Sequence, residues 1–158
     1  MKNLFILLII AIVIIIICKF NQKKFYKNIK IIDNPDNIHV LVNKNNKLAS
    51  VYVPKNLKLI PNTMGYNNKF LREDALEHFE KLWEESKKSN LKITIVSAYR
   101  DYDYQKKLFD GYVQDRGFKY ALLCSAKAGH SEHQTGLAVD LMGSNNDYNL
   151  FEDTPEFN

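Results

Sequence analysis

The stretch from Gly129 to Asp140 brings together side chains that can bind a metal ion or move a proton. His133 and Asp140 lie seven residues apart, where the sequence predicts the end of a loop and the strand that follows it. Imidazole and carboxylate groups are both zinc ligands, and a catalytic zinc takes three protein ligands and leaves one position for water. Gly136 would let the backbone turn tightly between the two ligands. The spacing alone favours the simpler interpretation, in which both residues make ordinary hydrogen bonds.

The elements that must position these residues alternate between helical and strand patterns. Apolar residues recur at helical spacing from Leu71 to about residue 88, which predicts an amphipathic helix that stops near Asn90. The β-branched run over residues 91–98 predicts a buried strand. The other expected elements are strands over 39–42 and 136–142, extended segments over 51–53 and 57–60, helices over 104–117 and 119–123, and a loop over 125–135. This order favours an α+β fold.

The first twenty residues are expected to form a membrane segment. Residues 4–18 are fifteen consecutive apolar residues, flanked by Lys2 and Lys19. As a helix they would span about 22 Å, short of the roughly 30 Å hydrocarbon core, so length leaves a cleaved signal peptide open. A signal peptide ends in small residues, however, and none follow here. We therefore predict a signal-anchor over residues 1–20, a Lys/Asn-rich tether over 21–38 and one domain over 39–158.

Charge is distributed unevenly along the chain. Residues 1–58 hold ten lysines and two acidic residues, a balance of +8, whereas residues 59–158 carry a balance of −4. A nucleic-acid-binding domain should carry its basic surface on the folded body. Only three of the 22 basic residues are Arg, the side chain best suited to bidentate phosphate contacts. We therefore expect no nucleic-acid partner.

Two motifs resemble those of a known enzyme family. The zinc-binding signature of the LAS metallopeptidases is matched by Ser131-x-His133-x-x-Gly136-x-Ala138-x-Asp140. Residues 95–100, followed by Gln105, are similar to the VanY-type D-alanyl-D-alanine carboxypeptidases of that family. The resemblance extends from about residue 39 to residue 142. It implies the LAS/hedgehog-type D,D-peptidase fold, which has a central antiparallel sheet with flanking helices.

By this resemblance His133 and Asp140 are two of the zinc ligands. Arg100 would bind the terminal carboxylate of the substrate, or the oxyanion that develops at the scissile carbonyl. Gln105 would position the substrate, and Ser131 would donate a hydrogen bond to the peptide. The simpler alternatives are a surface salt bridge between Arg100 and an adjacent aspartate, a helix-surface position for Gln105 and a loop cap for Ser131.

The resemblance also implies a third ligand and a general base. In the family both lie in a Glu-x-x-His motif downstream of the Asp ligand. No His follows His133 in this sequence, which continues for eighteen residues after Asp140. Nothing in the spacing of Glu152 or Glu156 makes either a substitute base. We therefore expect a C-terminally truncated family member with an incomplete fold and little or no peptidase activity of its own.

The function implied is that of a membrane-anchored, monomeric Zn²⁺ carboxypeptidase. It would remove the terminal D-Ala of peptidoglycan stem peptides that end in D-Ala-D-Ala, with its domain on the cell-wall side. The lysines after the apolar run favour a cytoplasmic domain by the positive-inside rule, and we give the location of the substrate precedence. The alternatives are a non-catalytic protein that binds cell-wall peptides, an inert gene fragment, and an endopeptidase that cuts elsewhere in the stem peptide.

Overall fold

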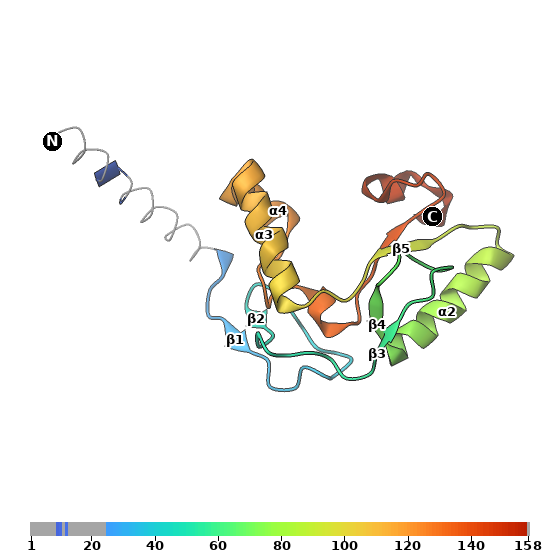
Figure 1. Ribbon diagram of the computed structural model, residues 1–158, viewed down its shortest axis with the longest axis horizontal. Coiled ribbons are helices and arrows are strands. Elements are labelled where there is room, and N and C mark those ends of the chain that lie inside the picture. Colours follow the sequence, from blue (N-terminus) through green and yellow to red (C-terminus); the bar gives the residue numbers. More distant parts are fainter. Residues whose placement is uncertain (1–8, 11, 13–24, 158) are drawn as a thin grey trace.

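The computed structural model describes residues 9, 10, 12 and 25–157. The signal-anchor predicted over residues 1–20 lies outside these residues, apart from Ile9, Ile10 and Ile12. No helix within the described ranges is long and apolar enough to cross a membrane. From residue 25 the described chain is continuous to residue 157 (Figure 1).

Short strands form three separate two-stranded sheets in the described part of the chain. The parallel pair is β1 (Lys30–Ile31) with β2 (Asn46–Lys47), and the antiparallel pairs are β3 (Leu57–Leu59) with β4 (Phe70–Arg72) and β5 (Thr94–Ser97) with β6 (Asp140–Met142). A parallel bridge between Gly65 and Ile95 places one more segment beside β5. The single central antiparallel sheet predicted from the sequence does not form within residues 25–157, because these strands are only two to four residues long and each pairs with one partner.

The helices follow the predicted pattern closely. The structure has α2 (Glu73–Lys88), α3 (Tyr102–Arg116) and α4 (Phe118–Cys124), and the 3₁₀ turns η1 (Glu132–Thr135), η2 (Tyr148–Asp153) and η3 (Pro155–Phe157). Asn90, with a φ of 56°, ends the region of α2 as predicted. The carboxylate of Asp101 caps α3 by accepting a hydrogen bond from the backbone N–H of Tyr104 at 2.7 Å. Gly117, with a φ of 85°, separates α3 from α4.

Two predicted strands differ from the structure. No strand forms over residues 39–42, where the backbone N–H of Val40 instead donates to the carbonyl of Asn37 in a turn. Of the apolar residues in this segment only Val42 is buried, and its burial does not require a strand. The strand predicted over 136–142 shortens to β6, since Gly136 is left-handed, with a φ of 69°, and ends turn η1.

Two clusters of buried side chains divide the described chain into two parts (Figure 1). The larger part, which we call the sheet part, contains β3 to β6 and α2. Its core is formed by Ile60, Leu71, Leu76, Phe79, Ile93, Ile95 and Ala98. The smaller part, which we call the α3–α4 part, has a core formed by Tyr26, Phe109, Ala121 and Leu122.

The segment predicted to be a tether contacts the folded chain from Tyr26 onward. Tyr26 is only 8% exposed, and its hydroxyl accepts a hydrogen bond from the backbone N–H of Lys127 at 3.2 Å. Burial raises the pKa of this phenol. Farther along, the hydroxyl of Tyr52 donates to the carboxylate of Asp36 at 3.0 Å. These contacts, together with the pairing of β1 and β2, hold the described part of the segment against the domain.

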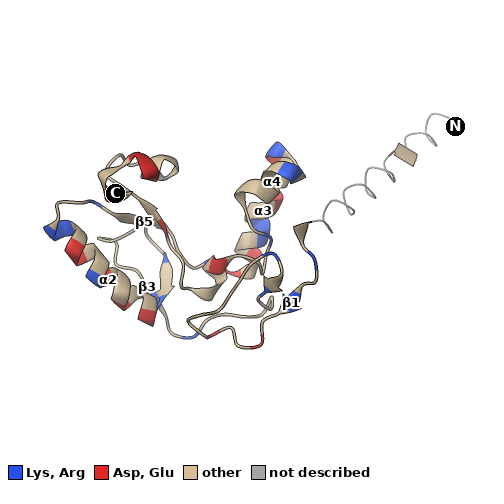
Figure 2. Cartoon of the chain, turned by 180° about the vertical axis from the view of Figure 1, so that it is seen from behind, with Lys and Arg blue, Asp and Glu red and all other residues tan. Residues whose placement is uncertain are grey.

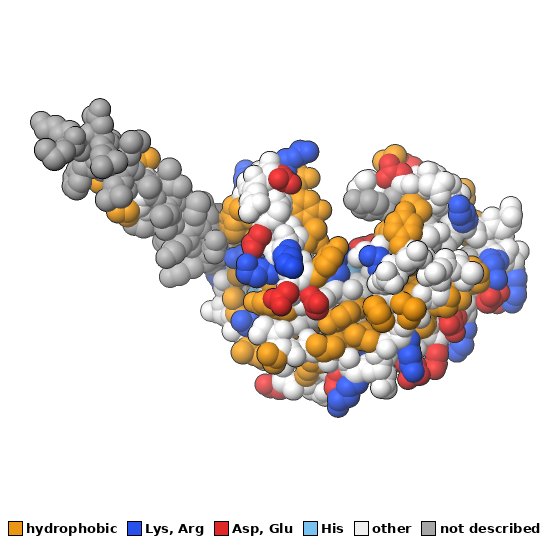
Figure 3. Space-filling view, in the orientation of Figure 1, with side chains coloured by type: hydrophobic (Ala, Val, Ile, Leu, Met, Phe, Trp, Pro, Cys, Tyr) orange, Lys and Arg blue, Asp and Glu red, His pale blue; other side chains and the backbone are white. Residues whose placement is uncertain are grey.

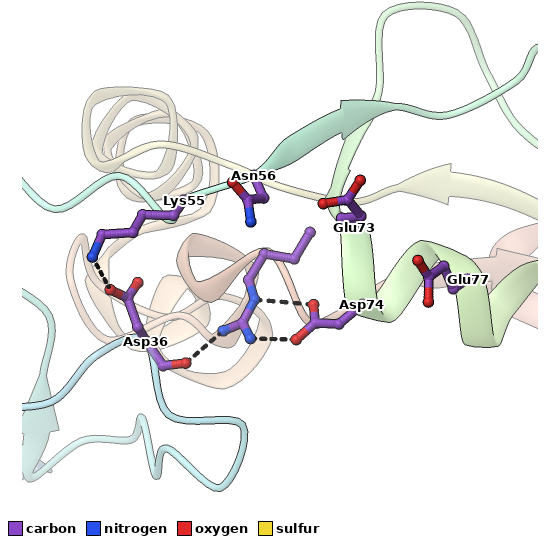
Figure 4. Close-up of a pocket in the computed structure, with 7 residues that line it drawn as sticks. Asp36, Lys55, Asn56, Glu73, Asp74 and Glu77 are labelled. Carbon is purple, nitrogen blue, oxygen red and sulfur yellow. Dashed lines mark hydrogen bonds and ion pairs between the residues drawn. The ribbon is translucent and has the colours of Figure 1, made fainter.

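Arg72 ties the start of α2 to the N-terminal segment (Figure 4). The guanidinium of Arg72 donates hydrogen bonds to both carboxylate oxygens of Asp74. It also donates to the carbonyl of Asp36 at 3.0 Å. The hydrogen bond from Arg72 is the main reason why the pKa of Asp74 lies below its ordinary value. The backbone N–H of Arg72 donates to the carbonyl of Gly136 at 2.9 Å. Arg72 thus fixes the backbone between the two candidate zinc ligands.

Ile95 is completely buried at the centre of the sheet part. We expect Ile95→Ala to lower the free energy of unfolding by about 2–5 kcal/mol, because it removes buried methyl groups and leaves a cavity. Urea denaturation followed by circular dichroism measures this loss. In the control Leu82→Ala the side chain removed is 54% exposed on α2, and we expect a change of about 0.5 kcal/mol or less. Equal losses in the two variants would contradict the core described above.

Candidate active site

A cleft of about 1000 Å³ lies between the sheet part and the α3–α4 part (Figure 3). All candidate site residues predicted from the sequence line this cleft, namely Arg100, Gln105, Ser131, His133 and Asp140. They come from the end of β5, from α3, from the loop and turn around η1, and from β6. The fold therefore gathers in one cleft residues that are far apart in the sequence.

His133 is buried and held by the end of strand β5. Its Nδ1 lies 2.6 Å from the carbonyl oxygen of Ala98. A carbonyl oxygen only accepts, so Nδ1 carries a proton, and Nε2 is the ring nitrogen left to bind a metal ion or a second proton. Hydrogen bonds of this kind orient the histidines of metal sites. Nε2 lies 3.3 Å from Oδ1 of Asp140, so the two candidate ligands face each other.

The spacing of these two atoms fits two ligands of one zinc ion. Zinc–nitrogen and zinc–oxygen distances of about 2.0–2.2 Å at a tetrahedral angle place two ligand atoms roughly 3.4 Å apart. With no cation or proton between them, two lone pairs would point at each other. When no metal ion is bound, a proton on Nε2 makes His133 a hydrogen-bond donor to Asp140, and this bond, followed by the charges of the protonated ring and of Arg100, holds the pKa of Asp140 below its ordinary value. The carboxylate of Asp140 is therefore ionised at neutral pH.

Arg100 lies three residues after the end of β5, a strand with an irregularity in its register between Ile95 and Ser97. Its Nη1 donates to Oγ of Ser97 at 3.1 Å and lies 3.5 Å from Oδ2 of Asp140. Its Nε is buried without a hydrogen-bond partner among the described residues. Burial lowers the pKa of the guanidinium, which still stays charged at neutral pH. Arg100 thus forms an ion pair with Asp140 and places a fixed positive charge in the cleft.

Gln105 and Ser131 are both buried in the wall of the cleft. Gln105 is 1% exposed, and its Nε2 donates to Oγ of Ser125 at 3.1 Å and to the carbonyl of Ala126 at 2.7 Å. Its Oε1 has no hydrogen-bond partner in the described part of the chain. Ser131 directly precedes η1 without a side-chain capping hydrogen bond. The helix-surface and loop-cap alternatives therefore do not describe these residues.

His130 directly precedes the zinc-binding signature and also lines the cleft. It is buried, because residues distant in the sequence cover it. Its Nδ1 lies 2.8 Å from the carbonyl of Asn43, and its ring packs edge-on against Tyr26 with centroids 4.7 Å apart. Burial lowers the pKa of His130. No local pattern indicates these contacts.

Ser97 is a site residue to which the sequence assigns no role. It binds Arg100, and in the register of β5 with β6 it lies opposite Asp140. Its hydroxyl also contributes to the lowered pKa of Asp140. The signal that would identify it is the antiparallel pairing of the two strands, which aligns a serine beside the candidate ligand.

The metal-binding chemistry of the cleft rests on two side chains. Within the described ranges, no group of three His, Cys, Asp or Glu residues is arranged to hold a metal ion. His133 and Asp140 could thus hold two of the three positions that protein ligands take at a catalytic zinc. The cleft combines this pair with a guanidinium that can bind a carboxylate.

Comparison with known proteins identifies the family. Residues 68–158 match the family profile described as VanY, D-alanyl-D-alanine carboxypeptidase. The matched region is more than half of the chain and contains every candidate site residue. The chain belongs to the VanY family. The resemblance seen in the two sequence motifs is therefore confirmed.

Individual relatives extend this match beyond the VanY profile. The chain is 35% identical over 137 residues to YodJ of Bacillus subtilis, an assigned carboxypeptidase, and this alignment covers 84% of the chain and 50% of YodJ. The structure of the LD-carboxypeptidase LdcB, described as revealing the basis of peptidoglycan recognition, superposes with a TM-score of 0.73 at 32% identity. That match covers 82% of the chain and 64% of LdcB. The VanY-family chain thus spans about half the length of its curated relative YodJ.

A VanY enzyme of the VanB-type resistance cassette shares the fold at lower similarity. Its structure, a mutant in complex with Zn(II), has a TM-score of 0.57 and 23% identity and covers 66% of this chain and 61% of its own. The expected LAS/VanY peptidase fold of mixed helices and sheets is confirmed by these neighbours. Zinc binding is a property of that VanY enzyme, and zinc is supported for this chain through the family.

Proposed function

We propose that this VanY-family chain forms the substrate cleft of a zinc D,D-carboxypeptidase that trims peptidoglycan stem peptides. The observation that carries the proposal is the meeting of His133, Asp140 and Arg100 in one cleft. The two ligand atoms are 3.3 Å apart, and the guanidinium lies 3.5 Å from the carboxylate. A pair of metal ligands beside a fixed positive charge suits a reaction at a peptide bond next to a terminal carboxylate.

Arg100 recognises the end of the substrate in this proposal. Its guanidinium is positioned by Ser97 and Asp140, and its buried Nε has no other partner among the described residues. A peptide carboxylate would satisfy that donor. Gln105, whose Oε1 is also without a partner in the described chain, would accept a hydrogen bond from a backbone N–H of the peptide.

His133 and Asp140 would hold the zinc ion. When bound, zinc polarises the scissile carbonyl and lowers the pKa of a bound water molecule. The carbonyl of Ala98 keeps Nε2 of His133 turned toward Asp140. The described residues offer two candidate ligands, so we propose that the remaining ligand and the general base come from a Glu-x-x-His motif outside them. On their own these residues would then bind the stem peptide and turn it over poorly.

We also propose that the chain is anchored in the cell membrane through residues 1–20, with its domain on the cell-wall side and acting as a monomer. The support is the run of fifteen apolar residues over 4–18 and the location of the proposed substrate. The four lysines of the tether over residues 21–38 would then lie close to anionic lipid headgroups.

Hydrolysis of an L,D bond is a second candidate reaction. It is favoured by the likeness to LdcB, an LD-carboxypeptidase that superposes with a TM-score of 0.73 over 82% of the chain. Both reactions use a terminal D-Ala carboxylate, which Arg100 would bind in the same way. They differ in the chirality of the residue before the scissile bond, so matched peptides distinguish them.

Peptide titration of the full chain in detergent micelles tests the proposal. We expect acetyl-L-Lys-D-Ala-D-Ala to bind at least about tenfold more tightly than its C-terminal amide, because a charge-assisted hydrogen bond contributes roughly 1.5–3 kcal/mol. Side-chain ¹⁵N resonances of Arg100 and Gln105 report the binding. Arg100→Ala should remove the preference for the free acid.

Arg116→Ala is the matched control for this titration, since Arg116 is an exposed arginine at the end of α3. It should keep the preference for the free acid. Equal affinities for acid and amide in the unmodified chain would refute the proposed recognition. Tighter binding of acetyl-L-Lys-D-Ala than of the D-Ala-D-Ala peptide would support the L,D reaction instead.

A further inference from the structure

The outer face of the α3–α4 part carries exposed apolar side chains next to the N-terminal segment. Leu123 on α4 is 78% exposed, and Tyr120, one turn earlier, is exposed as well. Phe25 and Ile29, at the start of the continuous chain, are also exposed. Single exposed apolar residues are ordinary, but a group of them beside one another marks an interaction surface.

The two segments that carry these residues are in contact. Tyr26 is buried in the same core as Leu122 of α4. A hollow of about 600 Å³ is lined by both residues together with Lys44 and Leu123. The Nζ atom of Lys44 lies 5.5 Å from the ring centre of Phe25. We call the surface formed by Phe25, Ile29, Lys44, Tyr120 and Leu123 the α4 face.

Positive charge surrounds the apolar residues of the α4 face. The stretches 25–31, 43–47 and 115–124, which form it, hold six basic residues and one acidic residue. Figure 2 shows Lys and Arg positions, coloured blue, at the end of the molecule that carries α4 and on the N-terminal segment. Residues 59–158 as a whole carry a balance of −4, so this charge is local. Aromatic and aliphatic side chains among lysines are typical of surfaces at the membrane interface.

We propose that the α4 face lies on the surface of an anionic lipid bilayer. The inference rests on the membrane anchoring in the proposed function. The apolar run over 4–18 ends seven residues before Phe25, and Tyr26 and β1 hold the following chain against the domain. A segment fixed in this way brings the α4 face close to the membrane. Lysines are attracted by anionic headgroups, while the apolar side chains enter the interfacial layer.

This placement also orients the cleft. Tyr104, Gln105 and Leu108 of α3 line the cleft, whereas Phe109 of the same helix belongs to the core shared with α4. Cys124, at the end of α4, however lines both the cleft and the hollow of the α4 face, so the two surfaces adjoin there. With the α4 face on the lipid, the cleft therefore lies beside the bilayer surface.

Fluorescence of the full chain in vesicles tests the proposal. Cys18→Ser leaves Cys124, an exposed thiol beside Leu123, as the only cysteine. It would be labelled with an environment-sensitive probe in vesicles of equal parts phosphatidylglycerol and phosphatidylcholine. We expect emission at shorter wavelength and several-fold stronger quenching by nitroxide lipid than for a probe at Leu82→Cys in a Cys18→Ser, Cys124→Ser background. Leu82 is the matched control because it is exposed on α2, at the far end of the domain (Figure 1).

A second variant separates lipid contact from other causes. Phe25→Asp combined with Leu123→Asp should reduce quenching of the probe on Cys124 to the level of the α2 probe. Equal quenching at both labelled positions, when flotation shows that the chain is bound to the vesicles, would overturn the proposal for the α4 face. It would not contradict the proposed membrane anchor. A buried probe that nitroxide lipid does not quench would indicate a second copy of the chain and also overturn it. A chain that does not float with the vesicles would refute both the anchor and the α4 face.

Discussion

The 158-residue chain loaded with zinc is expected to hydrolyse a peptide ending in D-Ala-D-Ala at least about 10²-fold more slowly than a VanY-family enzyme with a full set of ligands. The reason is that general acid–base catalysis alone contributes roughly 10²–10⁴-fold. The described cleft offers His133 and Asp140 as a ligand pair, and no third metal-binding side chain joins them within the described residues. Release of D-Ala, measured by a coupled oxidase assay with the chain in detergent micelles, gives the rate.

Two controls make this rate informative. A VanY enzyme with all its ligands, assayed under the same conditions, sets the upper reference. His133→Ala sets the lower one, because any release of D-Ala that survives this substitution comes from a contaminating enzyme. Turnover comparable to the upper reference and abolished by His133→Ala would show that two ligands suffice, which would contradict the proposed division of the site.

Removal of His133 is expected to weaken metal binding in the cleft by more than about 100-fold, beyond the 10–100-fold that loss of an outer-shell partner typically costs. The reason is that Asp140 then remains as a single carboxylate ligand, and its partner Nε2, 3.3 Å away, is gone. Titration with Co²⁺, a spectroscopic substitute for zinc, measures the effect through its visible absorption bands. The unmodified chain should develop these bands and His133→Ala should not.

His39→Ala is the matched control for the cobalt titration. His39 is an exposed histidine of the same domain, far from β6 in the sequence and not among the cleft-lining residues. The variant should bind cobalt like the unmodified chain. Asp140→Asn, which keeps the shape and removes the charge, should weaken binding as well. Unchanged binding in His133→Ala would refute the assignment of the ligand pair.

The sequence predicts the helices well because their signals are local. The apolar stripe of α2 and the glycine that ends α3 at Gly117 lie within a few residues of what they determine. The short sheets could not be predicted in the same way. β1 and β2 are two residues long, and the nearby Tyr26 is buried against α4, about a hundred residues away. The segment predicted to be a tether is held by those contacts.

The candidate site is predictable to the extent that its residues sit in motifs. His133, Asp140 and Arg100 stand out by type and spacing, and the fold places them in one cleft. His130 and Ser97 do not stand out. The first is buried by contacts with Tyr26 and Asn43 from the N-terminal segment, and the second acts through strand pairing. Contacts between residues distant in the sequence therefore determine the positions of the site residues that lie outside the recognisable motifs.

X-ray absorption at the zinc edge, on the chain loaded with one equivalent of zinc, tests the ligand pair most directly. We predict one imidazole per zinc, from His133, with the remaining ligands oxygen atoms from Asp140 and solvent. His133→Ala should remove the imidazole signal from the spectrum. A spectrum with two or more imidazoles per zinc, or with none in the unmodified chain, would contradict the site described here.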